Sequence, residues 1–328
     1  MNHSASSLIP HTSSVVSIVI VNWNGSQHLP ICLNSLRRQI FKDFEAILVD
    51  NNSSDVSIDL LKREYPEVKV IALRENRGFA GGSNVGLRQA SGSICVLLNN
   101  DTEVDPHWLQ VVVDTFDRHP EAGLIASKML RFDQRDRFHT TGDFYRLDGL
   151  PGNRGVWETD RGQYNTEEYV FSACGGSAAY RRSMLDQIGL FDEDFFFSCE
   201  DIDLSWRAQL AGWQCVYAPN AIVYHKLSAT GGGPIASFYD GRNFIYLLAK
   251  DYPATLWQKY RNLIIRRQWK LFVEALRSWR GAAARSRMRG MLAGLIGLPK
   301  MRRKRKSVQA RRTVDDEYLL SILLPPSS

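Results

Sequence analysis

Residues 15–21 read VVSIVIV, and this almost unbroken β-branched run is the strongest fold signal in the sequence. Such a run is typical of a strand that is covered on both faces of a sheet. Comparable apolar runs occur at 44–49 (FEAILV), 68–73 (VKVIAL) and 94–98 (ICVLL), and the segments between them have helical character. Strands that alternate with helices predict a parallel, doubly wound α/β sheet flanked by helices.

Polar residues stand directly after three of the predicted strands, at 22–24 (NWN), 50–55 (DNNSSD) and 99–101 (NND). In an open parallel sheet, ligands bind beyond the carboxyl ends of the strands. These clusters are therefore expected to converge on one ligand site. The glycine-rich link at 77–82 (RGFAGG) would let the backbone approach a diphosphate, but it matches neither GxGxxG nor the Walker pattern. The first strand is followed by 22–25 (NWNG), which is neither GxGxxG nor a glycine-rich loop with Arg and Lys, and this argues against a dehydrogenase and a nucleotidyltransferase.

The middle of the chain carries weaker structural signals. Residues 132–169 are polar and rich in Gly, Asp and Arg, so loops and one hairpin are expected there. Helices are predicted at 183–189 and 200–211, and strands at 213–217 and 222–225.

The composition is that of a folded globular protein, with 44% hydrophobic and 23% charged residues in 328. No apolar run reaches the roughly 18 residues of a membrane-spanning helix, and the polar first residues do not resemble a secretory signal. The five cysteines lack CxxC spacing. They indicate buried thiols in a reducing cytoplasm rather than disulfides or a zinc site.

Basic residues are concentrated near the C-terminus. Between Lys259 and Arg312 the chain has 18 of its 41 Lys and Arg residues but one acidic residue, Glu274. Residues 256–280 repeat apolar side chains at helical spacing, which predicts a basic amphipathic helix. Such a helix suits an anionic membrane surface, although it could also pack on the rest of the protein with its basic face in solvent. No recognisable nucleic-acid-binding motif accompanies these bases, so nucleic acid is not an expected partner.

Acidic residues are the main candidates for chemistry. Asp101 follows a predicted strand, where it could hold Mg²⁺ or Mn²⁺ beside a phosphate or simply close a turn. Glu200 and Asp201 are adjacent carboxylates, which raise each other's pKa and thereby suit a general base. Asp203 and Arg207 are spaced as i and i+4, which predicts a surface salt bridge.

Four blocks of sequence resemble the motifs of the family 2 glycosyltransferases. They are 16–25 (VSIVIVNWNG), 48–55 (LVDNNSSD), 75–101 (ENRGFAGGSN running on to LNND) and 197–207 (FSCEDIDLSWR). The similarity is greatest to bacterial rhamnosyltransferase-like members that build cell-surface polysaccharide. It implies a Rossmann-like GT-A domain that binds a nucleotide-sugar.

The resemblance also implies a division of the chain and a set of donor-binding residues. The expected parts are a disordered N-terminus at 1–14, the GT-A glycosyltransferase domain at 15–250 and an amphipathic basic helical extension at 251–328. The residues expected to bind the donor are Asn22, Asn24, Asp50, Asn52, Arg77, Asn84, Asn99 and Asn100.

Metal binding is also expected from the resemblance. Asp101 matches the last aspartate of the family's DxD motif, but Asn99 stands where the motif has its first aspartate. His225 matches a position where relatives supply a further metal ligand, although a hydrogen-bonded structural histidine is the alternative.

The reacting groups are implied in the same way. Asp201, with Glu200 beside it, matches the carboxylate that acts as base in related enzymes. The acceptor side is expected at Gly175, Gly176 and Ser177.

These assignments imply an inverting, metal-dependent glycosyltransferase. A rhamnose donor is favoured, carried by dTDP or UDP, and the expected acceptor is a lipid-linked oligosaccharide. The enzyme would be cytoplasmic, on the inner face of the cytoplasmic membrane through residues 256–312. The alternative is a non-catalytic nucleotide-sugar-binding protein, or a protein that interacts with membrane or nucleic acid, on the same fold. Asn99 is the only residue that favours this alternative.

Overall fold

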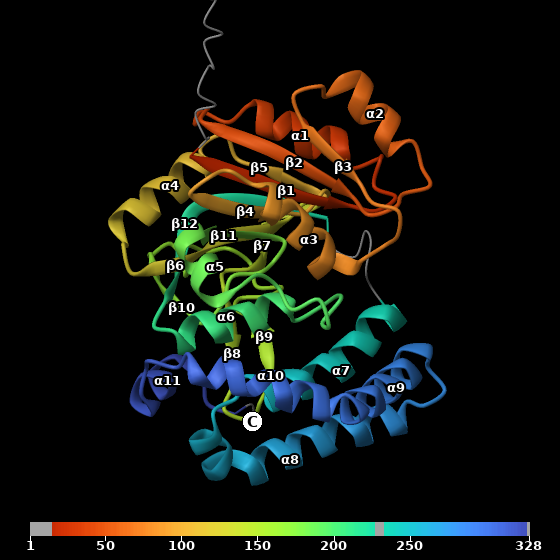
Figure 1. Ribbon diagram of the computed structural model, residues 1–328, viewed down its shortest axis with the longest axis vertical. Coiled ribbons are helices and arrows are strands. Elements are labelled where there is room, and N and C mark those ends of the chain that lie inside the picture. The colour runs from red at the N-terminus through yellow and green to blue at the C-terminus, as the bar shows by residue number, and fades with distance from the viewer. Residues whose placement is uncertain (1–14, 227–232, 327–328) are drawn as a thin grey trace, which may run out of the picture.

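The computed structural model describes residues 15–226 and 233–326, and it places a ten-stranded sheet beside a group of C-terminal helices (Figure 1). The first strands are β1 (Val16–Asn22), β2 (Phe44–Asp50), β3 (Lys69–Ala72) and β4 (Ile94–Leu98). They lie in the order β4-β1-β2-β3, and all neighbours are parallel. The predicted parallel arrangement is confirmed for this half of the sheet. The segment 1–14, expected to be disordered, lies outside the described residues.

The second half of the sheet is mixed rather than parallel. It consists of β5 (Thr102–Val104), β6 (Ala122–Arg131), β7 (Gln134–Thr140), β10 (Glu168–Val170), β11 (Ser177–Arg181) and β12 (Gln214–His225). The parallel prediction is wrong here, because β11 runs antiparallel to both β4 and β6. No helix lies between β6 and β11 in the chain, so no helical crossover imposes a parallel direction on this pair.

Strand β12 brings a distant histidine to the site. The two strands predicted at 213–217 and 222–225 are one strand, with an irregularity between Ala218 and Ile222. Beyond that point β12 pairs antiparallel with β5, and His225 stands opposite Thr102. This register places His225 next to the end of β4.

Helices cover both faces of the sheet, so its buried strands read as continuous apolar runs. They are α1 (Leu29–Arg37), α2 (Ser57–Glu64), α3 (Gly78–Gln89), α4 (Trp108–Arg118), α5 (Arg182–Ile188) and α6 (Glu200–Leu210). One core cluster contains side chains of α1, α2 and α4, and the other contains side chains of α3, α5 and α6. The expected hairpin in the middle region is β8 (Asp143–Tyr145) with β9 (Pro151–Asn153).

The C-terminal part consists of helices: α7 (Gly233–Lys250), α8 (Ala254–Arg277), α9 (Ala282–Ile296), α10 (Leu298–Ala310) and α11 (Asp316–Ile322). Their buried side chains, such as Leu256, Met301 and Leu319, share a core cluster with Trp206 of α6. The C-terminal helices are therefore packed against α6. Among the described residues, no helix is both long enough and apolar enough to cross a membrane.

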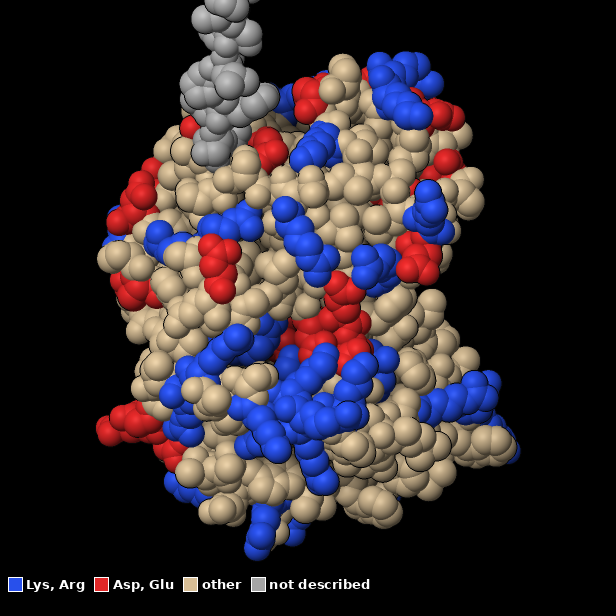
Figure 2. Space-filling model, viewed as in Figure 1, with Lys and Arg blue, Asp and Glu red and all other residues tan. Residues whose placement is uncertain are grey.

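Glycines bring α7 and α9 into backbone contact. A Cβ added at Gly290 would lie 2.0 Å from the Phe238 carbonyl oxygen, and one at Gly241 would lie 2.5 Å from the Arg287 carbonyl oxygen. Neither glycine can therefore be replaced without separating the helices. Lys and Arg gather on the face over the C-terminal helices (Figure 2). There Lys300 pairs with Asp194 of the loop between α5 and α6.

Candidate active site

A cavity of about 670 Å³ opens beyond the ends of β1 and β4, and its size is that of a small-molecule site. We call it the Trp23 cavity, and it is lined by Val21, Trp23, Asn51, Asn76, Gly78, Phe79, Asn99, Asn100, Phe196, Phe197, Pro234, Ile235, Phe238, Tyr239, Ser286 and Arg289. Trp23 is 43% exposed and offers an aromatic face to a ligand. The wall opposite the sheet comes from α7 and α9, so the C-terminal helices complete this cavity.

A polar network behind the cavity joins the ends of three strands. Asn22 donates to Asp50 Oδ1 at 3.0 Å and accepts from the Asn100 amide at 2.7 Å. Asp50 Oδ2 accepts from the Ser53 backbone N–H at 2.9 Å. Because Asn22 and Asp50 are almost fully buried, they shape the cavity floor and leave Asn100 at its surface.

The other residues expected at the donor site lie in different surroundings. Asn24 and Asn52 are exposed, are not among the residues that line the Trp23 cavity, and adopt left-handed backbone conformations, which asparagine tolerates well. Arg77 pairs with Glu193 at 3.0 Å. The amide of Asn84 bonds the backbone of Phe191 in both directions, at 2.9 Å each. Asn84 is therefore a buried anchor for that loop and does not line the cavity.

Asp101 and His225 lie together beneath the cavity. His225 Nε2 is 3.1 Å from Asp101 Oδ1, yet this oxygen has no hydrogen-bond partner among the described residues. His225 Nε2 also lies 3.3 Å from the Asn99 amide nitrogen, and His225 Nδ1 lies 3.0 Å from His139 Nδ1. Burial, and then the charge of His225, lower the pKa of His139 to about 3, so His139 is neutral.

A second cavity of about 450 Å³ adjoins the first, and both are lined by Phe79, Asn99 and Phe197. We call it the Asp201 cavity, after the carboxylate on its wall. Gly175 and Gly176 also line it, and the Gly175 N–H donates to Asp201 Oδ2 at 2.8 Å. Ser177 does not, because it is buried in β11 with its hydroxyl bonded to Ser127.

The environment of Asp201 suits a proton acceptor. Burial raises its pKa, while hydrogen bonds from the Gly175 and Ile202 backbone lower it. Burial and then the Asp201 charge raise the pKa of Glu200 well above its usual range. Glu200 Oε2 is buried without a hydrogen-bond partner among the residues described. Both carboxyl groups therefore have a raised proton affinity, which is the property that a general base needs.

The loop before α6 is held in a strained conformation. Phe196, Ser198 and Cys199 all have φ between 61° and 66°, a region that non-glycine residues rarely occupy. From α7, the Asn243 amide donates to the carbonyls of Phe195, Phe197 and Ser198, at 3.1, 3.0 and 2.6 Å. Helix α7 therefore fixes the start of the helix that carries Asp201.

The predicted surface salt bridge between Asp203 and Arg207 is a buried one. Arg207 Nε lies 3.0 Å from Asp203 Oδ2, but the side chains are 8% and 0% exposed. Lys250 of α7 contacts the other oxygen of Asp203 and lies 2.7 Å from Asp192. The surface prediction was wrong because helical spacing shows which residues are neighbours but not which face is covered.

Three residues that line the two cavities were not predicted from the sequence. Arg289 and Ser286 reach the Trp23 cavity from α9, which only the packing of α7 and α9 brings there. Asp143, 4% exposed, faces the Asp201 cavity from β8. Its Oδ1 accepts from Thr140 at 2.7 Å and from Asn153 at 2.8 Å. No local motif marks any of these positions.

Asp143 should make stability depend on pH. Burial, and then the Asp201 charge, raise its pKa from 3.8 to about 7. The protonated form is favoured in the fold, so its contribution is complete below about pH 4 and is lost as the pH rises through 7. Asp143→Asn removes this loss and should stabilise the protein by up to about 4 kcal/mol at pH 8 and by little at pH 4. Thermal denaturation at both pH values measures it.

The exposed Asp136→Asn is the matched control and should keep the wild-type profile. An Asp143→Asn variant with the same stability difference at pH 4 and pH 8 would refute the assigned protonation.

Comparison with known proteins identifies the family. The family model described as glycosyl transferase family 2 matches residues 17–189, more than half of the chain, so this chain belongs to that family. It is similar to N-acetylglucosaminyl-diphospho-decaprenol L-rhamnosyltransferase of Mycobacterium tuberculosis, with 26% identity over 269 residues, 75% of this chain and 87% of the relative. It is 25% identical over 222 residues to poly-beta-1,6-N-acetyl-D-glucosamine synthase of Staphylococcus aureus, covering 66% of this chain but 51% of that relative.

Solved structures agree on the fold. S. aureus TarS 1–349 in complex with UDP superposes with a TM-score of 0.55 at 18% identity, covering 90% of each chain. Mannosyltransferase PcManGT from Pyrobaculum calidifontis, in complex with GDP-Man and Mn²⁺, gives 0.54 at 14% identity, covering 95% of this chain and 87% of that one. The predicted GT-A fold and glycosyltransferase class are confirmed.

Proposed function

We propose that this glycosyltransferase moves a sugar, with rhamnose favoured, from a nucleoside diphosphate to a lipid-linked glycan acceptor in cell-surface polysaccharide synthesis, with inversion. The observation that carries the proposal is the contact between two cavities. The Trp23 cavity offers aromatic and amide groups to a nucleotide, and the Asp201 cavity holds a buried carboxylate. Both reach Asn99, where donor and acceptor would meet.

Relatives support the finer parts of this proposal. The M. tuberculosis relative is named for rhamnosyl transfer to a decaprenol-linked acceptor. One structural neighbour holds UDP, and another holds GDP-Man with Mn²⁺. We favour dTDP or UDP as the donor nucleotide.

The residues at Asp101 fit a divalent cation, Mg²⁺ or Mn²⁺. Two ligands of one ion, each at about 2.1 Å and at right angles, lie about 3 Å apart. Asp101 Oδ1 and His225 Nε2 have that separation, and the oxygen lacks another hydrogen bond among the described residues. His139 orients the His225 ring, as a residue behind a metal ligand does. When bound, the cation would neutralise charge on the diphosphate leaving group.

The chain's own groups account for the remaining chemistry. The acceptor hydroxyl oxygen attacks the anomeric carbon while the bond from that carbon to the diphosphate oxygen breaks, and the hydroxyl proton passes to Asp201. A single displacement inverts the configuration. The exposed Arg289 lines the Trp23 cavity and offers a cation to the diphosphate.

A thermal-shift panel of nucleoside diphosphates, with and without Mn²⁺, tests the proposal. A ligand that binds only the folded state raises its melting temperature. A Mn²⁺-dependent rise with dTDP or UDP supports the transferase site. If no nucleotide stabilises the protein while a control enzyme responds, the proposed donor site is refuted.

His225→Ala should remove most of that Mn²⁺-dependent rise, because it takes away one of the two protein ligands. We expect metal affinity to fall by at least about tenfold, measured by Mn²⁺ titration in the same assay. His107→Ala is the control, since the His107 side chain is 67% exposed and pairs with Asp105. A His225→Ala variant that keeps the full rise would show that His225 is structural.

We further propose that residues 256–312 lie on an anionic membrane, at the inner face of the cytoplasmic membrane. Trp269, Trp279 and Leu292 are more than half exposed. Exposed apolar side chains among many bases are typical of a peripheral membrane surface.

A further inference from the structure

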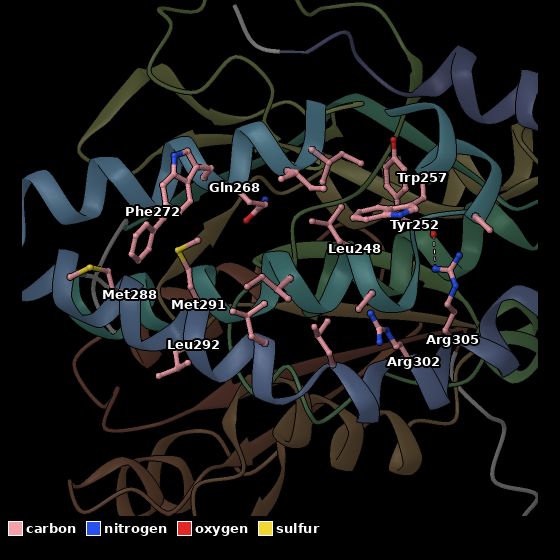
Figure 3. A pocket seen from close by; sticks show the side chains of 18 residues that line it. Leu248, Tyr252, Trp257, Gln268, Phe272, Met288, Met291, Leu292, Arg302 and Arg305 are labelled. Atoms are coloured by element: carbon pink, nitrogen blue, oxygen red, sulfur yellow. Dashed lines mark hydrogen bonds between the residues drawn. The ribbon is translucent and has the colours of Figure 1, made fainter. Parts of the chain in front are cut away.

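An apolar depression with a volume of about 730 Å³ lies among the C-terminal helices. We call it the Trp269 groove. Its walls are α7, α8 and the α9–α10 segment, and its lining is almost entirely aliphatic, aromatic and methionine side chains (Figure 3). Phe272 and Met288 lie at one end, and Arg302 and Arg305 lie at the other. The volume is typical of a ligand site.

Helix α7 connects this groove to the active site. Phe244 lines the Asp201 cavity, whereas Leu248, four residues further along the same helix, lines the groove. Residues i and i+4 lie on the same side of a helix, about 6 Å apart along its axis. Neighbouring turns of α7 therefore line the Asp201 cavity and the Trp269 groove.

The apolar side chains at the rim of the Trp269 groove are exposed, unlike those of a folded core. The rim side chains Ile265, Trp269, Leu292 and Leu295 are 55–64% exposed. Exposed apolar area of this extent marks a surface that another apolar molecule covers.

Two arginines at one end of the Trp269 groove indicate which kind of apolar molecule covers it. Arg305 is anchored by a 2.6 Å hydrogen bond to the Tyr252 carbonyl, and Arg302 is exposed. Met and aromatic side chains adapt to flexible apolar chains. An apolar channel that ends in guanidinium groups matches a long apolar chain that enters from an anionic lipid surface. A second protein surface would be expected to offer carboxylates instead.

We infer that the Trp269 groove binds the polyisoprenyl chain of the acceptor lipid. This inference rests on the proposed lipid-linked acceptor and adds the site that holds its apolar part. The polyisoprenyl chain lies along α7 and α8, while the sugar attached to it occupies the Asp201 cavity. The C-terminal helices then select the acceptor as well as completing the donor cavity.

Photocrosslinking tests the site without requiring catalysis. Farnesyl diphosphate that carries a benzophenone at its apolar end is irradiated with the full-length protein, and labelled peptides are identified by mass spectrometry. We expect label on α8 and α9 around Trp269, Met288 and Leu292. Label spread over the surface, or confined to other elements, would overturn the inference.

A matched pair of variants tests the role of the groove in transfer. Leu292→Glu places a charge in the groove, and Ile296→Glu places the same charge one turn along α9, outside it. Both side chains are exposed, at 60% and 73%, so both variants should fold. The acceptors are N-acetylglucosaminyl diphosphates that carry either a farnesyl or a methyl group.

The wild type should use the farnesyl acceptor with a KM about tenfold lower, the factor expected from burying about two methylene groups. Leu292→Glu should remove this preference, and Ile296→Glu should keep it. Equal KM values for the two acceptors in the wild type would overturn the inference. Loss of the preference for the farnesyl acceptor in both variants, together with reduced sedimentation on anionic vesicles, would also overturn the inference. The exposed face of α8 and α9 would then be only a membrane or subunit contact.

The crosslinking and transfer experiments together distinguish failure of the proposed function from failure of the groove inference. Crosslinking at the groove without sugar transfer to either acceptor would keep the isoprenoid site and refute the proposed acceptor sugar. Transfer to both acceptors without crosslinking would keep the transferase and refute the groove.

Discussion

Asp201→Asn should abolish sugar transfer while leaving donor binding almost unchanged. The substitution removes the proton acceptor, and general-base catalysis contributes about 10²–10⁴-fold to a rate. Asp201 lines the Asp201 cavity but not the Trp23 cavity, so the nucleotide should still bind. We expect kcat to fall about a thousandfold, while the dissociation constant for the nucleoside diphosphate changes by less than about threefold. Steady-state kinetics and calorimetric titration measure the two quantities.

The control is Asp186→Asn, an exposed carboxylate on α5. Asn at 201 can keep only one of the two backbone hydrogen bonds that Asp201 accepts from Gly175 and Ile202. Melting temperatures must therefore accompany the kinetics. Transfer above a tenth of the wild-type rate would show that the base is another group, with Asp143 and Glu200 the nearest candidates.

Lys250→Met should cost the protein about 3–5 kcal/mol of stability. Lys250 is 3% exposed, lies 2.7 Å from Asp192 and also contacts the fully buried Asp203. Removal of one partner leaves buried charge uncompensated, which is the expensive outcome for a buried ion pair. Arg207 remains beside Asp203, so the lower end of the range is the expected value.

Chemical denaturation measures this change, and the melting temperature should fall by about 4–7 °C. Lys259→Met, at an exposed position on α8, is the matched control. A loss below about 1 kcal/mol would mean that the buried network does not hold α6 and α7 together. Because Asp203 follows Asp201 on α6, the variant should also reduce kcat at temperatures where it is still folded.

Local patterns predicted the first half of the fold closely. The strand expected at 94–98 is β4, Ile94–Leu98, and the runs at 15–21 and 44–49 became β1 and β2. These strands are covered on both faces, so their consecutive residues are apolar and the strands can be recognised from the sequence. The direction of β11 was not predictable, because it depends on partners in β4 and β6 that lie far away in the chain.

The candidate site divides in the same way. Asp101, Asn99 and Asn100 follow the end of β4, and their convergence with the end of β1 could be expected from the sheet. Asn84 has the same amide group, but the structure uses it to anchor Phe191. The sequence motif that contains Asn84 indicates which residues are candidates for the site. It does not determine whether a side-chain amide faces a ligand or a neighbouring loop.

By itself, the sequence determined the class of this protein. Periodic burial set the strand-helix order, and the spaced motifs placed Asp101 and Asp201 at strand and helix ends. Only the tertiary structure decided that Arg289 reaches the Trp23 cavity, that Lys250 is buried with Asp203, and that the Trp269 groove shares α7 with the Asp201 cavity. The reason is physical: periodicity records whether a residue is buried, whereas the partner that buries it depends on contacts between segments far apart, such as the glycine contacts of α7 with α9.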